Sequence, residues 1–260
     1  MQWIFEDDHS RPVFTPEEHI SGKFPDGKVP GLPRRAVLFC LSRGLPLLRE
    51  RFGAEVLLEE LPGFITPTPV LVVPGYGDVC FVDGGRGAPQ AASVTETLHA
   101  MGVEEMLVVG LCGAFGQQVQ VGDLLMPEKI LSEEGASRHY FARREIAVPR
   151  GIWTREQAAE ALGQEIKGEN TVTTDAVYRQ TFYKEAQWRA QGYVGVDMEA
   201  SAIVNVCEYY GLKSTVLFMA SDKHPLTPEG PRWRWGGEDY ALYKRKQERF
   251  LTGCVELALK

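Results

Sequence analysis

The stretch that decides the fold is residues 79–116, which has the sequence VCFVDGGRGAPQAASVTETLHAMGVEEMLVVGLCGAFG. It opens with the apolar run Val79–Val82, passes through a glycine loop, and continues with a predicted helix over about residues 90–101. A second apolar run, Met106–Val109, again ends at glycines. Short apolar runs are typical of strands buried on both faces, and their alternation with helices predicts a largely parallel sheet covered by helices.

The chain on either side extends this alternation. A proline and glycine segment, Pro74–Asp78, joins two of the apolar runs and predicts a hairpin. The other expected strands are 36–41, 70–73, 124–126, 194–198 and 214–220, and the other expected helices are 45–52, 154–162, 178–190, 201–210 and 238–259. No repeat or linker divides residues 36–260, so we expect one α/β domain there.

The first 35 residues differ from the rest of the chain. They mix prolines and glycines and show neither the helical nor the strand period of apolar residues. We therefore expect residues 1–35 to be an irregular extension that wraps the surface or a neighbouring subunit.

The composition excludes several classes of protein. A chain of 260 residues, 44% of them hydrophobic, can bury about three quarters of its unfolded surface without a metal or disulfide to hold the core. The net charge of -7 argues against nucleic acid or an anionic membrane as a partner. No apolar run approaches the ~18 residues of a membrane helix.

The cysteines and the N-terminal residues indicate a cellular compartment. Five widely spaced cysteines without a C-x-x-C pair predict neither a metal site nor a disulfide framework. The first residues lack the basic and apolar regions of a secretory signal. We therefore expect a protein of the reducing cytoplasm.

Three loops follow apolar strands and mark the expected ligand site. They are residues 84–89, 110–116 and 221–224, and ligands of open α/β sheets bind beyond the carboxyl ends of the strands. None of the loops has the G-x-G-x-x-G spacing and distant acidic residue of a dinucleotide site. The glycines either let the backbone approach a ligand closely or permit tight turns.

Carboxylates stand at one of these loops and at a further strand end. Asp197 and Glu199 lie where an apolar strand meets a helix, and a carboxylate facing a pocket can accept two hydrogen bonds from a vicinal diol. The alternative is a carboxylate favoured by the helix dipole. Asp222 follows the last core strand and can give a proton to a leaving group if its pKa is raised, or else is a turn or N-cap aspartate.

The order and spacing of these features resemble nucleoside phosphorylase superfamily I, which includes purine nucleoside phosphorylases, uridine phosphorylases and methylthioadenosine nucleosidases. The resemblance runs from about Ala36 to the C-terminus. The motifs that carry it are Gly85-x-Gly87-x-Pro89, Val109-Gly110-x-Cys112-Gly113-Ala114, Val121-Gly122-Asp123, Glu134-Gly135-Ala136-Ser137-x-His139-Tyr140, Val196-Asp197-Met198-Glu199-Ala200 and Ser221-Asp222.

The resemblance implies a single domain with a mixed central sheet, partly closed into a barrel, and cleavage of the N-glycosidic bond of a nucleoside. It implies that Met198 and Glu199 bind the ribose and that Asp222 protonates the leaving base, which favours purines. His139 is either a ligand of the sugar 5′-hydroxyl or a structural residue. The residues expected on the base side are Thr173, Thr174, Asp175, Tyr178 and Phe182. No resident cofactor and no metal are implied, and a homo-oligomer such as a dimer or a trimer of dimers is expected.

The chain departs from the family pattern at the phosphate site. Val108 and Leu111 stand where phosphorylases carry an arginine and a serine or threonine, and an apolar pair cannot bind a dianion. The remaining candidates for an anion site in altered geometry are Arg43, Arg49, Arg86, Gly44 and Gly110. The alternative is that the arginines face solvent.

Three hypotheses about activity stay open. The first is phosphorolysis to free base and (deoxy)ribose 1-phosphate, with inorganic phosphate as co-substrate. The second is a phosphate-independent nucleosidase, although the loop after the first strand offers no glutamate as a base. The third is a nucleoside-binding protein without turnover, against which the presence of both Glu199 and Asp222 argues.

Overall fold

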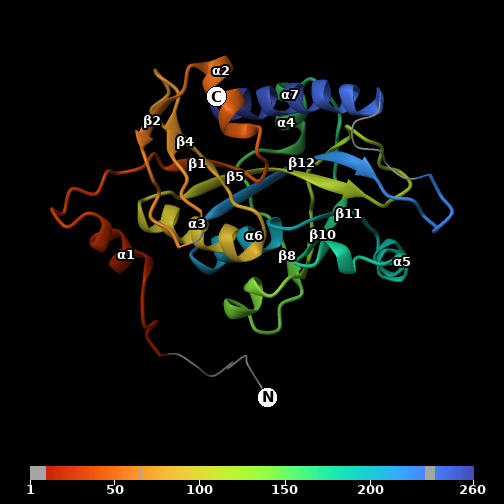
Figure 1. Ribbon diagram of the computed structural model, residues 1–260, viewed down its shortest axis with the longest axis horizontal. Coiled ribbons are helices and arrows are strands. Elements are labelled where there is room, and N and C mark those ends of the chain that lie inside the picture. Colours follow the sequence, from red (N-terminus) through yellow and green to blue (C-terminus); the bar gives the residue numbers. More distant parts are fainter. Residues whose placement is uncertain (1–9, 65, 232–237) are drawn as a thin grey trace.

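A central sheet between two layers of helices organises the protein (Figure 1). This computed structural model describes residues 10–64, 66–231 and 238–260. Within them the sheet has 12 strands, and nine follow the order β2-β3-β4-β1-β5-β11-β10-β7-β8. The strands are β1 Arg35–Phe39, β2 Glu55–Leu58, β3 Val70–Val72, β4 Val79–Asp83, β5 Glu105–Ala114, β6 Leu124–Leu125, β7 Ile130–Glu133, β8 Ile146–Ala147, β9 Ile166–Lys167, β10 Asn170–Thr174, β11 Tyr193–Asp197 and β12 Lys213–Lys223.

The sheet branches at the long strand β5. Over its first half β5 pairs in parallel with β1, and along its whole length it pairs in parallel with β12. At its last residues it pairs antiparallel with β11, while β12 pairs onward with β6 and then β9. The sheet is therefore mixed, as the family resemblance predicts.

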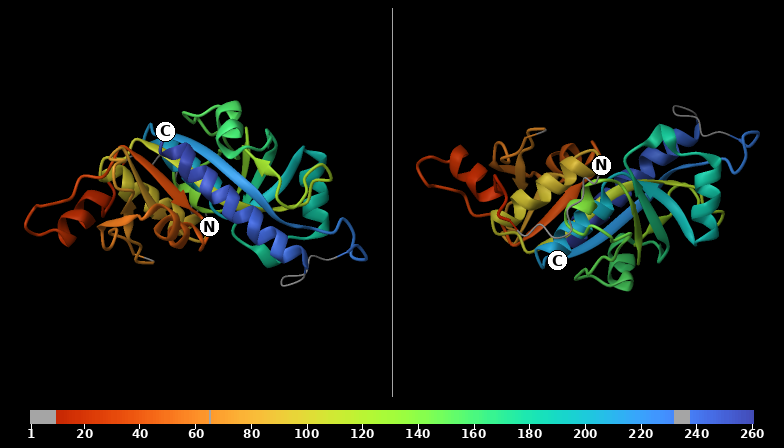
Figure 2. Two further views of the ribbon diagram at one scale, coloured as in Figure 1. Left: turned by 90° about the horizontal axis from the view of Figure 1, so that it is seen from above. Right: turned by 90° about the horizontal axis from the view of Figure 1, so that it is seen from below.

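Helices cover both faces of this sheet (Figure 2). They are α1 Pro16–Lys23, α2 Gly44–Phe52, α3 Ala88–Ala100, α4 Arg155–Leu162, α5 Phe182–Ala190, α6 Ala200–Tyr209 and α7 Glu238–Ala258, with 3-10 turns η1 Ala136–His139 and η2 Val177–Arg179. Alternate side chains of β1 explain the two layers, because successive strand residues point to opposite faces. Ala36 and Leu38 pack in the core beneath α3 and α6, whereas Val37 and Phe39 pack in the core beneath α2, α4 and α7.

The first described residues differ from the irregular extension that was expected. They contain the helix α1, which begins at a capping box formed by Thr15 and Glu18, with Pro16 at its first position. Ile20 is its buried residue, and α1 packs on α3. The apolar residues of α1 form no helical stripe, and the capping box marks only where the helix begins. The periodicity of apolar residues therefore does not predict this helix.

Two further element boundaries shift in ways that affect the site. The helix expected from residue 178 begins at Phe182, where the Thr181 side chain accepts a hydrogen bond from the Lys184 backbone. The strand expected to end at Ala220 continues to Lys223. Asp222 is therefore a strand residue. In residues 10–64, 66–231 and 238–260, none of the helices has both the length and the apolar character that a bilayer crossing requires.

Candidate active site

The loops after β1, β4 and β11 meet at one edge of the sheet. A Cβ on Gly84 would lie 2.9 Å from the Cys40 sulfur, so glycine permits this close packing. Gly87 has a φ of 89°, in the region that favours glycine, and its backbone N–H donates to Glu199 Oε1 at 2.6 Å. Segments that are 112 residues apart in sequence are joined by this one contact.

Asp197 caps the helix that follows it. Its Oδ2 accepts from the backbone N–H groups of Glu199 and Ala200 at 2.8 and 2.6 Å, and its Oδ1 accepts from the Thr173 hydroxyl at 2.6 Å. Burial raises the pKa of Asp197, and these three hydrogen bonds oppose that rise. The interpretation of a carboxylate at a helix N-terminus therefore applies to Asp197.

The Glu199 side chain does not cap α6 and instead contacts the glycine loop. It turns away from α6 toward this loop, and the residue is only 7% exposed. Burial and the negative charge of Asp197 raise the pKa of Glu199, while the Gly87 N–H and the Arg86 charge oppose the rise. The result is a buried carboxyl group beside a close-approach glycine loop, which can bind a ligand hydroxyl.

Asp222 lies at the carboxyl end of β12, just after a break in the strand register. Ala220 is opposite Cys112 and Asp222 is opposite Gly113, so Ser221 is the extra residue of a bulge. Bulges of this kind re-aim side chains next to functional sites. The Ser221 hydroxyl donates to Asp222 Oδ1, and the charges of Asp197 and Asp222 both add to the burial that raises the pKa of Cys112.

A histidine and a second glutamate complete this end of the site. His224 Nε2 lies 3.2 Å from Asp222 Oδ2, and His224 Nδ1 lies 2.7 Å from Glu185 Oε1. Sequence reasoning gave neither residue a role. A signal was present for Glu185, because it stands three residues before Trp188 on the buried side of α5, where an acid is unusual.

A hollow of about 240 Å³ opens beside these two side chains. Its walls are Val177, Gln180, Phe182, Glu185, His224 and Pro225. The mixture of apolar walls and a few polar groups is typical of a small-molecule site.

The structure places the other predicted sugar and base residues at different depths. Met198 is half-buried beside Glu199, whereas His139 is exposed at the end of η1. Thr173 is fully buried, with its hydroxyl bonded to Asp197 and Ser201, and Thr174 is also buried. Phe182 lines the hollow, Tyr178 is exposed, and the exposed Asp175 accepts from the Gly135 backbone N–H at 2.8 Å.

The predicted phosphate residues do not form one cluster. Arg43 pairs with Glu50 and with Glu248 of α7, at 2.6 and 3.2 Å, and Arg49 is exposed on α2. Arg86 pairs with Asp83 at 2.8 Å and lies close enough to Glu199 to affect its pKa.

Packing accounts for the glycines and apolar residues of this region. A Cβ on Gly44 would lie 2.2 Å from the Phe39 ring, and one on Gly110 would lie 2.9 Å from the Phe218 ring. Val108 is fully buried in the core beneath α3 and α6, and Leu111 packs on the opposite core.

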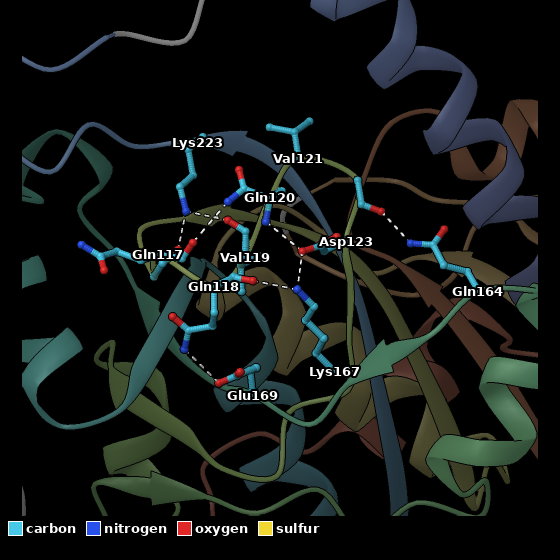
Figure 3. Close-up of polar contacts among 12 residues, drawn as sticks. Gln117, Gln118, Val119, Gln120, Val121, Asp123, Gln164, Lys167, Glu169 and Lys223 are labelled. Atoms are coloured by element: carbon cyan, nitrogen blue, oxygen red, sulfur yellow. Dashed lines mark hydrogen bonds and ion pairs between the residues drawn. The ribbon is translucent and has the colours of Figure 1, made fainter.

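The loop after β5 is held by lysines (Figure 3). Lys223 Nζ donates to the carbonyls of Gly116 and Val119, the second at 2.5 Å, and Lys246 Nζ donates to Val121 at 3.0 Å. Lys167 Nζ bonds the Gln118 carbonyl and Asp123 Oδ2, each at 2.7 Å. This loop contains the Val121-Gly122-Asp123 motif and fixes the ends of β5 and β12, from which Asp222 and His224 extend.

The fold is a single mixed α/β domain, and its carboxylates lie at strand ends, where α/β proteins bind small molecules. The sequence model of the phosphorylase superfamily matches residues 43–249, and the chain belongs to that family. It is 30% identical to a guanosine phosphorylase of Halorubrum lacusprofundi over 139 residues, a match that covers 53% of this chain and 58% of that protein. It is 26% identical to DeoD-type purine nucleoside phosphorylases of Bacillus cytotoxicus over 189 residues (70% of this chain, 80% of that protein) and of Clostridium novyi over 185 residues (67% and 78%).

Proposed function

We propose that this protein cleaves the N-glycosidic bond of a purine nucleoside by phosphorolysis, giving the free base and (deoxy)ribose 1-phosphate. The observation that carries the proposal is that two neighbouring carboxylates, Asp197 and Glu199, have different hydrogen-bond partners. Asp197 holds the start of α6, which leaves Glu199 at the glycine loop with a carboxyl oxygen for the ribose hydroxyls. Relatives named as guanosine and purine nucleoside phosphorylases support the reaction and the base.

The reaction needs stabilisation at both ends of the breaking bond. Its transition state is like an oxocarbenium ion, with positive charge on the sugar and negative charge on the departing base. Glu199 binds the 2′ and 3′ hydroxyls on the sugar side. Asp222, at the end of β12, gives a proton to the base, and the hollow lined by Phe182 receives the base.

Phosphate must bind through groups other than those usual in the family. Among the three arginine candidates, Arg86 has the strongest support, because its guanidinium lies within electrostatic reach of Glu199. Arg43 is held by two carboxylates, one of them on α7. Phosphate would have to displace Asp83 from Arg86, which is an exchange of one anion for another.

Hydrolysis is the second candidate, and a specific observation favours it. Val108 and Leu111 leave an apolar strand where phosphate ligands are expected, and the guanidinium groups of Arg43 and Arg86 are already ion-paired. Water would then attack the anomeric carbon.

The test is an assay of inosine, guanosine, adenosine and uridine with and without phosphate, with chromatography of the base and sugar products. Phosphorolysis predicts base release only with phosphate, and cleavage that is equal without phosphate would establish hydrolysis instead. Asp222→Asn should lower purine cleavage by about 100-fold or more. The control Asp78→Asn changes an exposed aspartate in the β3–β4 turn, and its activity should equal that of the parent.

The same assay tests the anion site. Arg86→Met should raise the KM for phosphate by about tenfold, because one charged hydrogen-bonding partner is lost. Arg34→Met is its control, since Arg34 is also an exposed arginine paired with a carboxylate, that of Glu104, but lies at the opposite end of β1. An unchanged KM in Arg86→Met would remove Arg86 from the phosphate site.

We also propose that the protein is a homo-oligomer that acts in the cytoplasm, with a small nucleoside as its partner. Val177, Tyr178 and Tyr183 are exposed, and in sequence they flank or belong to the residues Val177 and Phe182 that line the hollow. Exposed apolar surfaces mark interaction sites on soluble proteins. A neighbouring subunit would cover these residues and close the hollow.

A further inference from the structure

His224 is fixed in place by both its backbone and its ring. Its backbone N–H donates to the Ala114 carbonyl at 2.8 Å, which ties it to the end of β5. Its ring lies directly over Gly113, where a Cβ would come within 2.5 Å of Nε2. Only glycine at position 113 leaves room for this ring.

The ring is held between two carboxylates from different elements. Asp222 on β12 lies on the Nε2 side at 3.2 Å, and Glu185 on α5 lies on the Nδ1 side at 2.7 Å. Glu185 is 6% exposed, and it also accepts from Gln180 Nε2 at 3.2 Å and faces Arg189 at 3.7 Å. The glutamate is therefore fixed by its neighbours and fixes the imidazole in turn.

The charged and titratable groups around His224 favour its protonated form. Lys223 points away, toward the carbonyls of the loop after β5, and Tyr243 of α7 lies close enough to Asp222 for that charge to affect its pKa. Burial alone would lower the pKa of His224, but its hydrogen bonds to Asp222 and Glu185 outweigh burial and raise it to about 9. At neutral pH both ring nitrogens therefore carry protons and donate.

We propose that His224 is a positioning residue that orients Asp222 and supplies the proton which Asp222 passes to the leaving base. This inference rests on the proposed cleavage of a nucleoside. It assigns to Glu185 the task of holding the imidazole in its charged form.

The proton transfer balances without any further reactant. The proposed step starts from an ion pair between the His224 imidazolium and Asp222. As the glycosidic bond breaks, its electron pair moves to the base nitrogen, the base gains one proton through Asp222, and Nε2 loses one proton to Asp222. Afterwards Asp222 is again a carboxylate, and His224 is neutral with its remaining proton on Nδ1, bonded to Glu185.

The hollow beside His224 lets solvent reprotonate the imidazole. The His224 side chain is 22% exposed and forms part of the wall, so water can return the proton once the base has left. A carboxylate that is bonded only to backbone groups would have no neighbouring side chain from which to take a proton.

The test is the pH dependence of kcat for purine nucleoside cleavage between pH 6 and pH 10. For the parent we expect kcat to fall as pH rises through about 9, because His224 then loses its proton. Glu185→Gln should move this fall to lower pH by at least about one unit, since the charge that favours the imidazolium is gone. His224→Gln should lower kcat by about 100-fold and abolish this fall.

The matched control is Glu133→Gln. Glu133 is a carboxylate that pairs with Lys184 of the same helix as Glu185, and it does not contact His224. Its pH profile should equal that of the parent. NMR titration of the His224 ring in the parent and in Glu185→Gln measures the imidazole pKa without turnover and shows that the variant is folded.

The outcomes separate this inference from the proposed function. Cleavage by both proteins, with a shifted alkaline limb in Glu185→Gln, supports the inference. Cleavage with the same alkaline limb in both overturns the inference and leaves the proposed function standing. No cleavage of any nucleoside by the parent overturns the proposed function, and the proton transfer to a base with it.

Discussion

Glu199 and Asp197 show how two carboxylates of the same short segment take different roles. Asp197 accepts three hydrogen bonds, two of them from the backbone of α6. Glu199 accepts from the Gly87 N–H and remains buried beside the charge of Asp197. A buried carboxyl beside a second negative charge costs stability when ionised, and such costs are typical of functional groups.

Glu199→Gln should therefore stabilise the fold and lower activity. The raised pKa means that the folded protein holds the Glu199 proton more tightly than the unfolded chain does. The stability contributed by this group falls as pH rises above the unfolded pKa, until the folded carboxyl has ionised as well. We expect the free energy of unfolding at pH 9 to rise by on the order of 1 kcal/mol in the variant, as denaturant titration would measure.

Above about pH 8, where the Glu199 carboxyl is ionised, the same variant should cleave nucleosides at least about 100-fold more slowly, because an amide oxygen is a weaker acceptor than a carboxylate. At pH 4, where the carboxyl is protonated in the parent, the two stabilities should agree. A variant less stable than the parent at pH 9 would mean that the ionised carboxylate supports the fold.

The chemistry of single residues was only partly predictable from the sequence. The strand ends marked Glu199 and Asp222, because apolar runs identify where a parallel sheet presents its ligands. The partner of Glu199 could not be found, since Gly87 lies 112 positions away. Glu185 and His224 come together from separate elements for the same reason.

At the scale of elements, β12 and the loop after β5 determine where Asp222 stands. The Lys223 ammonium bonds the Gly116 and Val119 carbonyls, so the last residue of β12 locks the loop that follows β5 (Figure 3). The bulge at Ser221 lies just before it. The position of the site therefore depends on a polar loop as well as on the apolar core.

Lys223→Met should remove the hydrogen bonds that hold the loop after β5. Two carbonyls lose a charged donor, and we expect the free energy of unfolding to fall by about 2 kcal/mol. Lys213→Met is the control, because Lys213 begins the same strand, is 60% exposed and pairs with Glu105. Equal stability of the two variants, measured by denaturant titration, would show that the loop does not depend on Lys223.

The long apolar runs of the chain predicted their strands and helices, but the expected elements did not include β2, β7, β8, β9 and β10. The strands near residues 36–41 and 106–109 and the helix after Thr154 occur close to where they were expected. The helix α1 was missed because Ile20 is its only buried residue, so its apolar residues form no helical stripe. The extension of β12 past Ala220 was missed because its last residues are Ser221, Asp222 and Lys223, which show no strand pattern.

At the scale of the whole molecule, two layers of helices leave one edge of the sheet available for a ligand. Helices α3 and α6 cover one face, and α2, α4 and α7 cover the other (Figure 2). Glu199 follows β11 at the start of α6, and Asp222 lies at the end of β12, so both carboxylates stand at strand ends.

The exposed surface around Tyr178 leads to a prediction about assembly. Tyr178 is 96% exposed and Tyr183 is 74% exposed, next to Val177. Light scattering after size-exclusion chromatography should give a mass that is a multiple of the 29.0 kDa chain. Tyr178→Asp together with Tyr183→Asp should reduce that mass. A monomeric parent would contradict this proposal.

The most direct test of the central claim follows the sugar product of purine nucleoside cleavage in the presence of phosphate. The account predicts one ribose 1-phosphate for every base released, and no release when phosphate is left out. Free ribose, formed at the same rate with and without phosphate, would contradict it.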